Sequence, residues 1–145
     1  MTKLSLIILL SILSVGSLSA QILNPVKFTY SVTKKANNLL EVHIKTAVQP
    51  HWHIYSVHNP DGGAQATAIK IKNASAVGKP KEIGKLISIQ DNAFNVNQKF
   101  FENSVDFVQT VKGKGAKEIE GTIEYMVCND HQCLPPKEVQ FKIKL

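Results

Sequence analysis

An alternation of apolar and polar residues, repeated in short runs along the chain, constrains the fold more than any other feature. Residues 26–32 alternate in this way, and residues 40–48 repeat the pattern after a polar, turn-like stretch at 34–38. A period of two is that of a half-buried β-strand. Two such runs joined by a short polar turn predict a β-hairpin.

Further short runs follow, separated by turn signals such as Asn59-Pro-Asp-Gly-Gly63 and Lys112-Gly-Lys-Gly115. There is no internal repeat, no low-complexity tract and no amphipathic helical pattern of ten residues or more. Seven to nine short strands at regular spacing predict an all-β fold, an immunoglobulin-like antiparallel β-sandwich. The further strands are expected at residues 68–72, 86–89, 104–112, 119–127 and 139–145.

The first 20 residues have the pattern of a secretory signal peptide. Lys3 precedes an apolar run from Leu4 to Val15, and small residues end at Ala20. We therefore expect a signal peptide at 1–20 and one exported domain at 21–145, with no stable membrane insertion after cleavage. A signal anchor is the alternative. Later in the chain no segment is apolar and long enough to span a bilayer.

The charge pattern argues against nucleic acid as a partner. The formal net charge is +6, yet all 17 basic residues are lysines, which are scattered along the chain without a run of more than two. Arginine's planar guanidinium is the group that phosphates and base edges usually require. The basic residues are therefore expected to form a solvated surface.

Cys128 and Cys133, the two cysteines of the chain, lie in the stretch Tyr125-Met-Val-Cys-Asn-Asp-His-Gln-Cys-Leu-Pro-Pro136. Export would place them where disulfides persist. A bridge between them closes so short a loop that it would stabilise the fold by only about 2 kcal/mol. The spacing therefore favours thiol–disulfide exchange, which needs a nucleophilic thiol and a nearby resolving thiol. A structural disulfide is the alternative.

The cysteine stretch resembles the N-terminal periplasmic domain of the thiol:disulfide interchange protein DsbD. The features that carry the resemblance are a tyrosine-containing strand, the paired cysteines and the tail Cys133-Leu-Pro-Pro136. Trp52-His-Ile-Tyr55 is similar to the family's tyrosine-rich strand below its cysteines. Phe94, counted back from Phe101, matches the family's cap phenylalanine, which covers the active site.

The resemblance implies a role for each of these residues. Cys133 would form the mixed disulfide with a partner and Cys128 would resolve it, while Phe94 would shield the thiols. Trp52, Tyr55, Asp91 and His131 would form the environment of the site. The implied partners are a thioredoxin-like or DsbD-type membrane electron donor and oxidised periplasmic thiol proteins, and no cofactor is implied.

The sequence departs from the family pattern in three ways. The loop between the cysteines is one residue shorter than in the best-known members, and the acidic pair before the cap phenylalanine is reduced to Asp91. The chain also ends at Leu145, without a membrane-spanning or thioredoxin-like domain. We therefore expect the electron donor to be a separate protein.

The histidines allow further interpretations. A protonated His131 between the cysteines would lower a thiol pKa, although Asp130 would oppose this. His51, His53 and His58 are candidate ligands for copper or zinc, with His51 and His53 expected on one strand face. An exposed strand face is the simpler interpretation of these residues.

Three hypotheses follow. The first is an exported, periplasmic relay domain that accepts two electrons from its donor and passes them to oxidised proteins through Cys128 and Cys133. The second is a non-enzymatic immunoglobulin-like binding module with an inert bridge. The third is a metal-binding periplasmic protein that uses the histidines.

Overall fold

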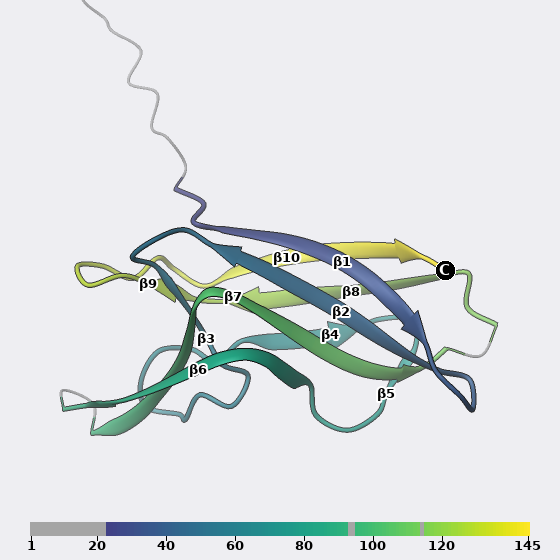
Figure 1. The fold of residues 1–145 in the computed structure, drawn as a ribbon, viewed down its shortest axis with the longest axis horizontal. Helices are drawn as coiled ribbons and strands as arrows, with labels where there is room; N and C mark the ends of the chain where they lie inside the picture. Colours follow the sequence, from purple (N-terminus) through teal and green to yellow (C-terminus); the bar gives the residue numbers. More distant parts are fainter. Residues whose placement is uncertain (1–22, 93–94, 114) are drawn as a thin grey trace, which may run out of the picture.

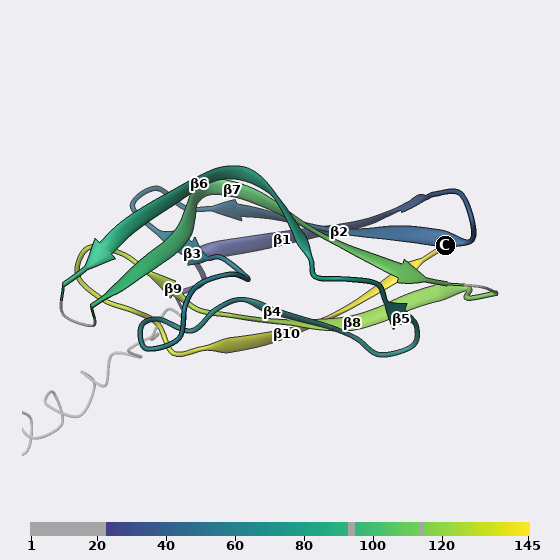
Figure 2. The same cartoon turned by 90° about the horizontal axis from the view of Figure 1, so that it is seen from below.

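The structure is a computed structural model that describes residues 23–92, 95–113 and 115–145. Within these ranges the chain forms ten strands and no helix, and every strand pair is antiparallel. The strands make two layers, which Figure 2 shows edge-on, with β6, β7, β2 and β1 above β4, β8 and β10. The predicted all-β, immunoglobulin-like sandwich is confirmed. The signal peptide expected at 1–20 lies outside the described residues.

Several strand boundaries follow the alternation of the sequence closely, but the strand expected at 104–112 already begins at Val96. They are β1 (Val26–Lys34), β2 (Leu39–Val48), β3 (His53–Tyr55), β4 (Ala68–Ile71), β5 (Ser75–Ala76), β6 (Lys81–Asp91), β7 (Val96–Lys112), β8 (Glu118–Tyr125), β9 (Val127–Cys128) and β10 (Lys137–Lys144).

The large sheet has the strand order β1-β2-β7-β3-β9, and β5 and β6 pair with the other edge of β7 (Figure 1). The predicted hairpin of β1 and β2 is confirmed by the pairing of Val26 with Val48 and of Lys34 with Leu40. The turn between them uses Asn37 and Asn38, both with positive φ. Asparagine tolerates this left-handed conformation better than most residues.

The small sheet has the order β10-β8-β4 and covers the inner face of the large one. Gly121 in β8 permits close pairing with its two neighbours in this sheet, because a Cβ there would lie 2.6 Å from the carbonyl oxygen of Lys70 in β4 and 2.6 Å from the ring of Phe141 in β10. The main core between the sheets consists of alternate residues from both layers, such as Val42, Ile44, Ile54, Phe101, Phe107, Ile119 and Ile123.

β7 runs along most of the molecule and changes its partner on the way. Its last residues pair with β2, whereas Phe100–Glu102 pair with β3. Between the two sections, Asn103 has a φ of 62°, which bends the strand. Just beyond the bend, the buried hydroxyl of Thr46 donates to the Val105 carbonyl at 3.0 Å and accepts from the Val105 amide at 2.9 Å. Thr46 thus satisfies two main-chain groups where the β2–β7 ladder ends.

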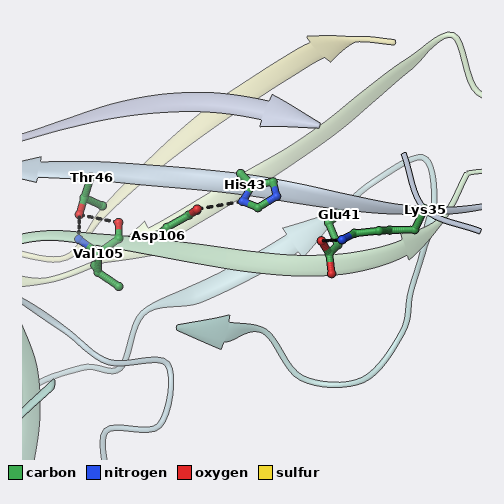
Figure 3. A network of polar contacts seen from close by, with 6 residues as sticks. All are labelled: Lys35, Glu41, His43, Thr46, Val105 and Asp106. Atoms are coloured by element: carbon green, nitrogen blue, oxygen red, sulfur yellow. Dashed lines mark hydrogen bonds and ion pairs between the residues drawn. The ribbon is translucent and has the colours of Figure 1, made fainter. Parts of the chain in front are cut away.

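Polar side chains also tie β2 to its neighbours away from the core, as Figure 3 shows. His43 Nδ1 lies 2.8 Å from Oδ2 of Asp106, which is diagonally across from it on β7. Lys35 and Glu41 form an ion pair of 3.0 Å beside the first turn. The exposed ion pair contributes little stability, so the sheet depends mainly on its ladders and its buried face.

β6 is longer than predicted: a strand was expected at 86–89, and β6 spans Lys81–Asp91. It pairs only with β7, and three of its apolar residues are 62, 48 and 53% exposed, namely Ile83, Leu86 and Ile89. An edge strand of this kind buries few side chains, so its alternation is weak. Main-chain pairing with β7 defines the element instead.

The chain changes sheets immediately before the cysteine loop. A continuous strand was expected over residues 119–127, but β8 ends at Tyr125 in the small sheet and β9 begins at Val127 in the large sheet. Tyr125 and Val127 are both buried in the main core. The alternation therefore continues through Met126 although the pairing partner changes. In the described part of the chain, no helix is apolar and long enough to cross a membrane.

Candidate functional site at the cysteine loop

Cys128 and Cys133 form a disulfide, with their Cα atoms 4.0 Å apart. Cys128 is the last residue of β9. Cys133 lies beside it on the returning limb of the loop, and the two residues form an isolated antiparallel β-bridge. The amide of Leu134 donates to the carbonyl of Val127 at 2.9 Å. The two limbs are thus held together by the main chain as well as by the sulfur atoms.

Asn129 shapes the tight loop between the cysteines. Its Oδ1 accepts hydrogen bonds from the amides of His131 at 2.9 Å and Gln132 at 2.8 Å, and its own amide donates to the Gln132 carbonyl at 2.9 Å. This side-chain-to-backbone pattern is typical of an Asx turn. Because the turn satisfies its own polar groups, the loop is ordered without support from the core.

The two sulfur-bearing residues differ in exposure. Cys128 is 2% exposed, whereas Cys133 is exposed on the returning limb. An external thiolate can therefore reach Cys133 Sγ far more readily than Cys128 Sγ. Attack at Cys133 would release the Cys128 thiolate into the protein, which keeps it available for the reverse step.

Cys128 packs in a small second cluster with Tyr55 and Phe100, and Ala64, Ile87 and Met126 pack against it. Strand register explains the cluster. Tyr55 pairs with Phe100, and Phe100 pairs with Ile87, so all three share one face of the large sheet. That face lies opposite the one on which Ile54 and Phe101 enter the main core.

His53 belongs to the same face and lies directly across from Cys128 in the β3–β9 ladder. Its ring centroid is 4.3 Å from that of Phe100, and its Nε2 is 3.2 Å from the Tyr55 hydroxyl. Burial lowers the pKa of His53 below its usual 6.5, while the carboxylates of Glu102 and Asp130 act in the opposite direction. Burial outweighs the carboxylates, so the neutral imidazole is favoured.

A shallow pocket of about 430 Å³ opens over this face. Asp91, at the end of β6, lines it together with His53, Tyr55 and Asp130. Burial, and to a smaller extent the charge of Asp91, raises the pKa of Tyr55 above 10.0. Tyr55 therefore remains a neutral phenol. The end of β6, the start of β7 and the loop after β9 lie at the same end of the sandwich in both views (Figures 1 and 2).

The structure brings some of the predicted site residues together and separates others. Tyr55 packs with Cys128, and Asp91 lines the pocket over the same face of the sheet. Trp52 is 7% exposed and packs in the main core instead of the second cluster. His131 is exposed at the tip of the loop. Phe94 lies outside the described residues, so its shielding role stays a prediction.

The expectation that His51 and His53 share one strand face is wrong. His51 lies in the turn before β3 with a φ of 68°, and it is exposed. His53 begins the strand and is half-buried. His58 is exposed in the loop that follows. Among residues 23–92, 95–113 and 115–145, no three His, Cys, Asp or Glu side chains gather in a group that could hold a metal ion.

Sequence reasoning missed His53 and Phe100 as neighbours of Cys128, and Glu102 as a neighbour of His53. His53 was considered only as a metal ligand. The signal that identifies these residues is the pairing of β3 with both β7 and β9, which brings three distant segments into register. A single sequence does not reveal such non-local pairing.

The returning limb leads into Pro135 and Pro136, which lack amide donors and so interrupt the ladder. Pairing with β8 resumes at Lys137, two residues before the strand expected at 139–145. A groove of about 310 Å³ lies along this limb, between it and Leu23, Asn24 and Pro25.

Comparison with known proteins supports a common fold. Residues 19–145 match the family described as the N-terminal domain of the thiol:disulfide interchange protein DsbD. The reduced DsbD N-terminal domain of Neisseria meningitidis aligns with a TM-score of 0.58 and 14% identity, covering 81% of this chain and 84% of that domain. No curated protein matches the chain.

Two further structures align with it. The N-terminal periplasmic domain of ScsB from Proteus mirabilis gives a TM-score of 0.64 and 12% identity, covering 88% of this chain and 49% of that one. The chain thus spans about half the length of the ScsB domain. A complex between the DsbD and PilB N-terminal domains of Neisseria meningitidis gives a TM-score of 0.62 and 14% identity. The alignment covers 84% of this chain and 87% of that one.

Proposed function

Because this chain belongs to the family of DsbD N-terminal domains, which are thiol:disulfide interchange domains with a cysteine pair, we propose that it is an exported electron relay. It accepts two electrons from a reduced donor and passes them to oxidised periplasmic proteins through Cys128 and Cys133. The observation that carries this proposal is the contrast between buried Cys128 and exposed Cys133 within one short disulfide loop.

The reductive half of the cycle follows from this contrast. The Cys133 thiolate attacks the disulfide of an oxidised protein, forms a mixed disulfide and releases one thiolate of that protein. The Cys128 thiolate then attacks Cys133 Sγ, which reforms the intramolecular disulfide and releases the second thiolate. Two electrons and two protons leave this domain, and the substrate becomes a dithiol.

The expected partners are a thioredoxin-like or DsbD-type membrane donor and oxidised periplasmic thiol proteins. The solved complex of a DsbD N-terminal domain with a PilB N-terminal domain supports the idea that this fold docks against a second protein. The periplasmic origin of the ScsB domain supports the same compartment here. Phe94 would shield the reduced thiols between encounters.

An equilibrium titration against glutathione, read by thiol alkylation, tests the proposal. A reduction potential of roughly −180 to −270 mV is that of exchange proteins, and we expect a value in this range. A potential well below about −300 mV would mark a structural disulfide. The inert binding module would then be the better description.

A pair of single-cysteine variants tests the assignment of roles. Cys128→Ala keeps the exposed thiol and should accumulate a stable mixed disulfide with glutathione disulfide. Cys133→Ala is the matched control, and its buried thiol should react much more slowly. Equal trapping by the two variants would contradict the assignment, whatever the potential of the native pair.

A further inference from the structure

We propose that His53 is the general base that removes the proton from Cys128 during the resolution step. This inference rests on the proposed function, because it assigns a role within the same thiol exchange. It concerns the second half of the cycle, when Cys128 must become a thiolate before it can attack the mixed disulfide at Cys133.

Strand register places His53 next to the sulfur it would serve. His53 and Cys128 are directly paired in the β3–β9 ladder. In an antiparallel pair, directly opposite residues have Cβ atoms about 4.5–5.5 Å apart and project to the same face. The imidazole of His53 and the thiol of Cys128 are therefore neighbours on one face of the sheet.

The surroundings of His53 hold the ring in place on this face. Phe100 lies at a centroid distance of 4.3 Å and a tilt of 34°, and the Tyr55 hydroxyl lies 3.2 Å from Nε2. Tyr55 and Phe100 both pack with Cys128 in the second cluster. The same two aromatic residues therefore position the imidazole and the thiol.

The charged groups around the ring suit proton exchange. Glu102 faces it from β7, Asp130 from the cysteine loop and Asp91 from the end of β6 across the pocket. Tyr55 is the neighbouring titratable group on its own strand. Burial lowers the pKa of His53, so the ring is neutral at pH 7 and able to accept a proton. The carboxylates then stabilise the imidazolium that forms.

The protons and electrons of the step balance without a further reagent. Cys128 gives its proton to His53, and the thiolate attacks Cys133 Sγ. The bond between Cys133 and the substrate breaks, and the departing substrate thiolate takes the proton from His53. His53 thus ends the cycle neutral, as it began.

The expected size of the effect follows from the thiol. An unassisted thiol with a pKa near 8.5 is only about 3% ionised at pH 7, so complete removal of the proton would accelerate attack about 30-fold, which is the ceiling for any base. Because the pKa of His53 is lowered and lies below that of the thiol, the imidazole takes the proton only in part before the attack, and we expect His53→Gln to slow resolution about 3- to 10-fold at pH 7. Formation of the mixed disulfide at Cys133 should be unchanged.

The experiment uses the reduced mature protein and glutathione disulfide, with acid quenching and mass spectrometry to separate mixed-disulfide formation from its resolution. The resolution rate of the native protein should be flat near pH 7 and fall at lower pH, as the pH approaches the lowered pKa of His53. In His53→Gln it should rise about tenfold per pH unit towards pH 8.5. His51→Gln, which changes an exposed turn histidine, is the matched control and should behave as the native protein.

Chemical rescue distinguishes a proton-transfer role of His53 from a purely structural one. Added imidazole should restore resolution in His53→Ala, since the pocket beside the ring is open to solvent, and it should not affect the native rate. Normal mixed-disulfide formation together with an unchanged resolution profile in His53→Gln would overturn this inference alone. A native protein that forms no mixed disulfide would overturn the proposed function, and this inference with it.

Discussion

Reduction of the Cys128–Cys133 disulfide should leave the sandwich folded and cost only about 2 kcal/mol. The cysteines are separated by five positions in the sequence. Chain-entropy arithmetic for a closed loop of about six residues gives roughly 7 cal/mol/K, or about 2 kcal/mol at 25 °C. Neither cysteine belongs to the main core, so its packing survives when the sulfur bond breaks.

The free energy by which the disulfide stabilises the fold also determines how much folding changes the reduction potential of the cysteine pair. For a two-electron couple, 1.4 kcal/mol corresponds to about 30 mV, so folding should make the disulfide only about 45 mV harder to reduce. A protein that must alternate between dithiol and disulfide needs this small difference. Folding would make a structural disulfide much harder to reduce than this.

Urea unfolding of the oxidised and reduced forms measures the difference directly. With an m-value of about 2 kcal/mol/M, the urea midpoint should fall by about 1 M on reduction. The variant with Cys128→Ala and Cys133→Ala is the control, and its midpoint should not respond to reductant. A reduced protein that is unfolded without urea, or that loses more than about 4 kcal/mol, would refute the argument.

Three further predictions concern single side chains. Thr46→Val should lower the free energy of unfolding by about 2 kcal/mol in urea titrations, because it leaves two buried main-chain groups of Val105 without partners; a loss below about 0.5 kcal/mol would contradict this. The lowered pKa of His53 means that the unfolded chain binds more protons, so stability should be lost as the pH falls below about 6.5. Thermal unfolding across this range should show a smaller loss in His53→Gln, and identical pH profiles would disprove the coupling. Phe94→Ala should leave the fold intact but speed oxidation of the reduced thiols by small oxidants, and unchanged kinetics would remove Phe94 from the mechanism.

The sequence predicts the fold class well because the sandwich is built from amphipathic strands. In β2 the alternation identifies the buried side even at Thr46, a polar residue that is 5% exposed. The same reasoning underestimates β6. Ile83, Leu86 and Ile89 are exposed there, so hydrophobic periodicity carries no signal. Main-chain pairing with β7 determines that element, and pairing leaves little trace in local sequence.

The site is predictable only in part, for a related reason. Cys128 and Cys133 are visible because their spacing is local. His53 reaches Cys128 through a ladder between segments 75 positions apart in the chain, so no local pattern connects them. Trp52 and Tyr55 were grouped as one aromatic motif, yet they point to different clusters. Trp52 lies in the turn before β3 and Tyr55 ends this three-residue strand, and these positions determine that Trp52 faces the main core and Tyr55 the second cluster.

The separation of the small cluster from the main core has a consequence for motion. Tyr55, Phe100 and Cys128 pack on the face of the large sheet that lies away from the sandwich interior. Such a satellite cluster can open locally at a free-energy cost far below that of global unfolding. Amide hydrogens of β9 should therefore exchange with solvent earlier than those of β2 or β8. The buried sulfur then becomes reachable through brief local openings, while the sandwich itself stays closed.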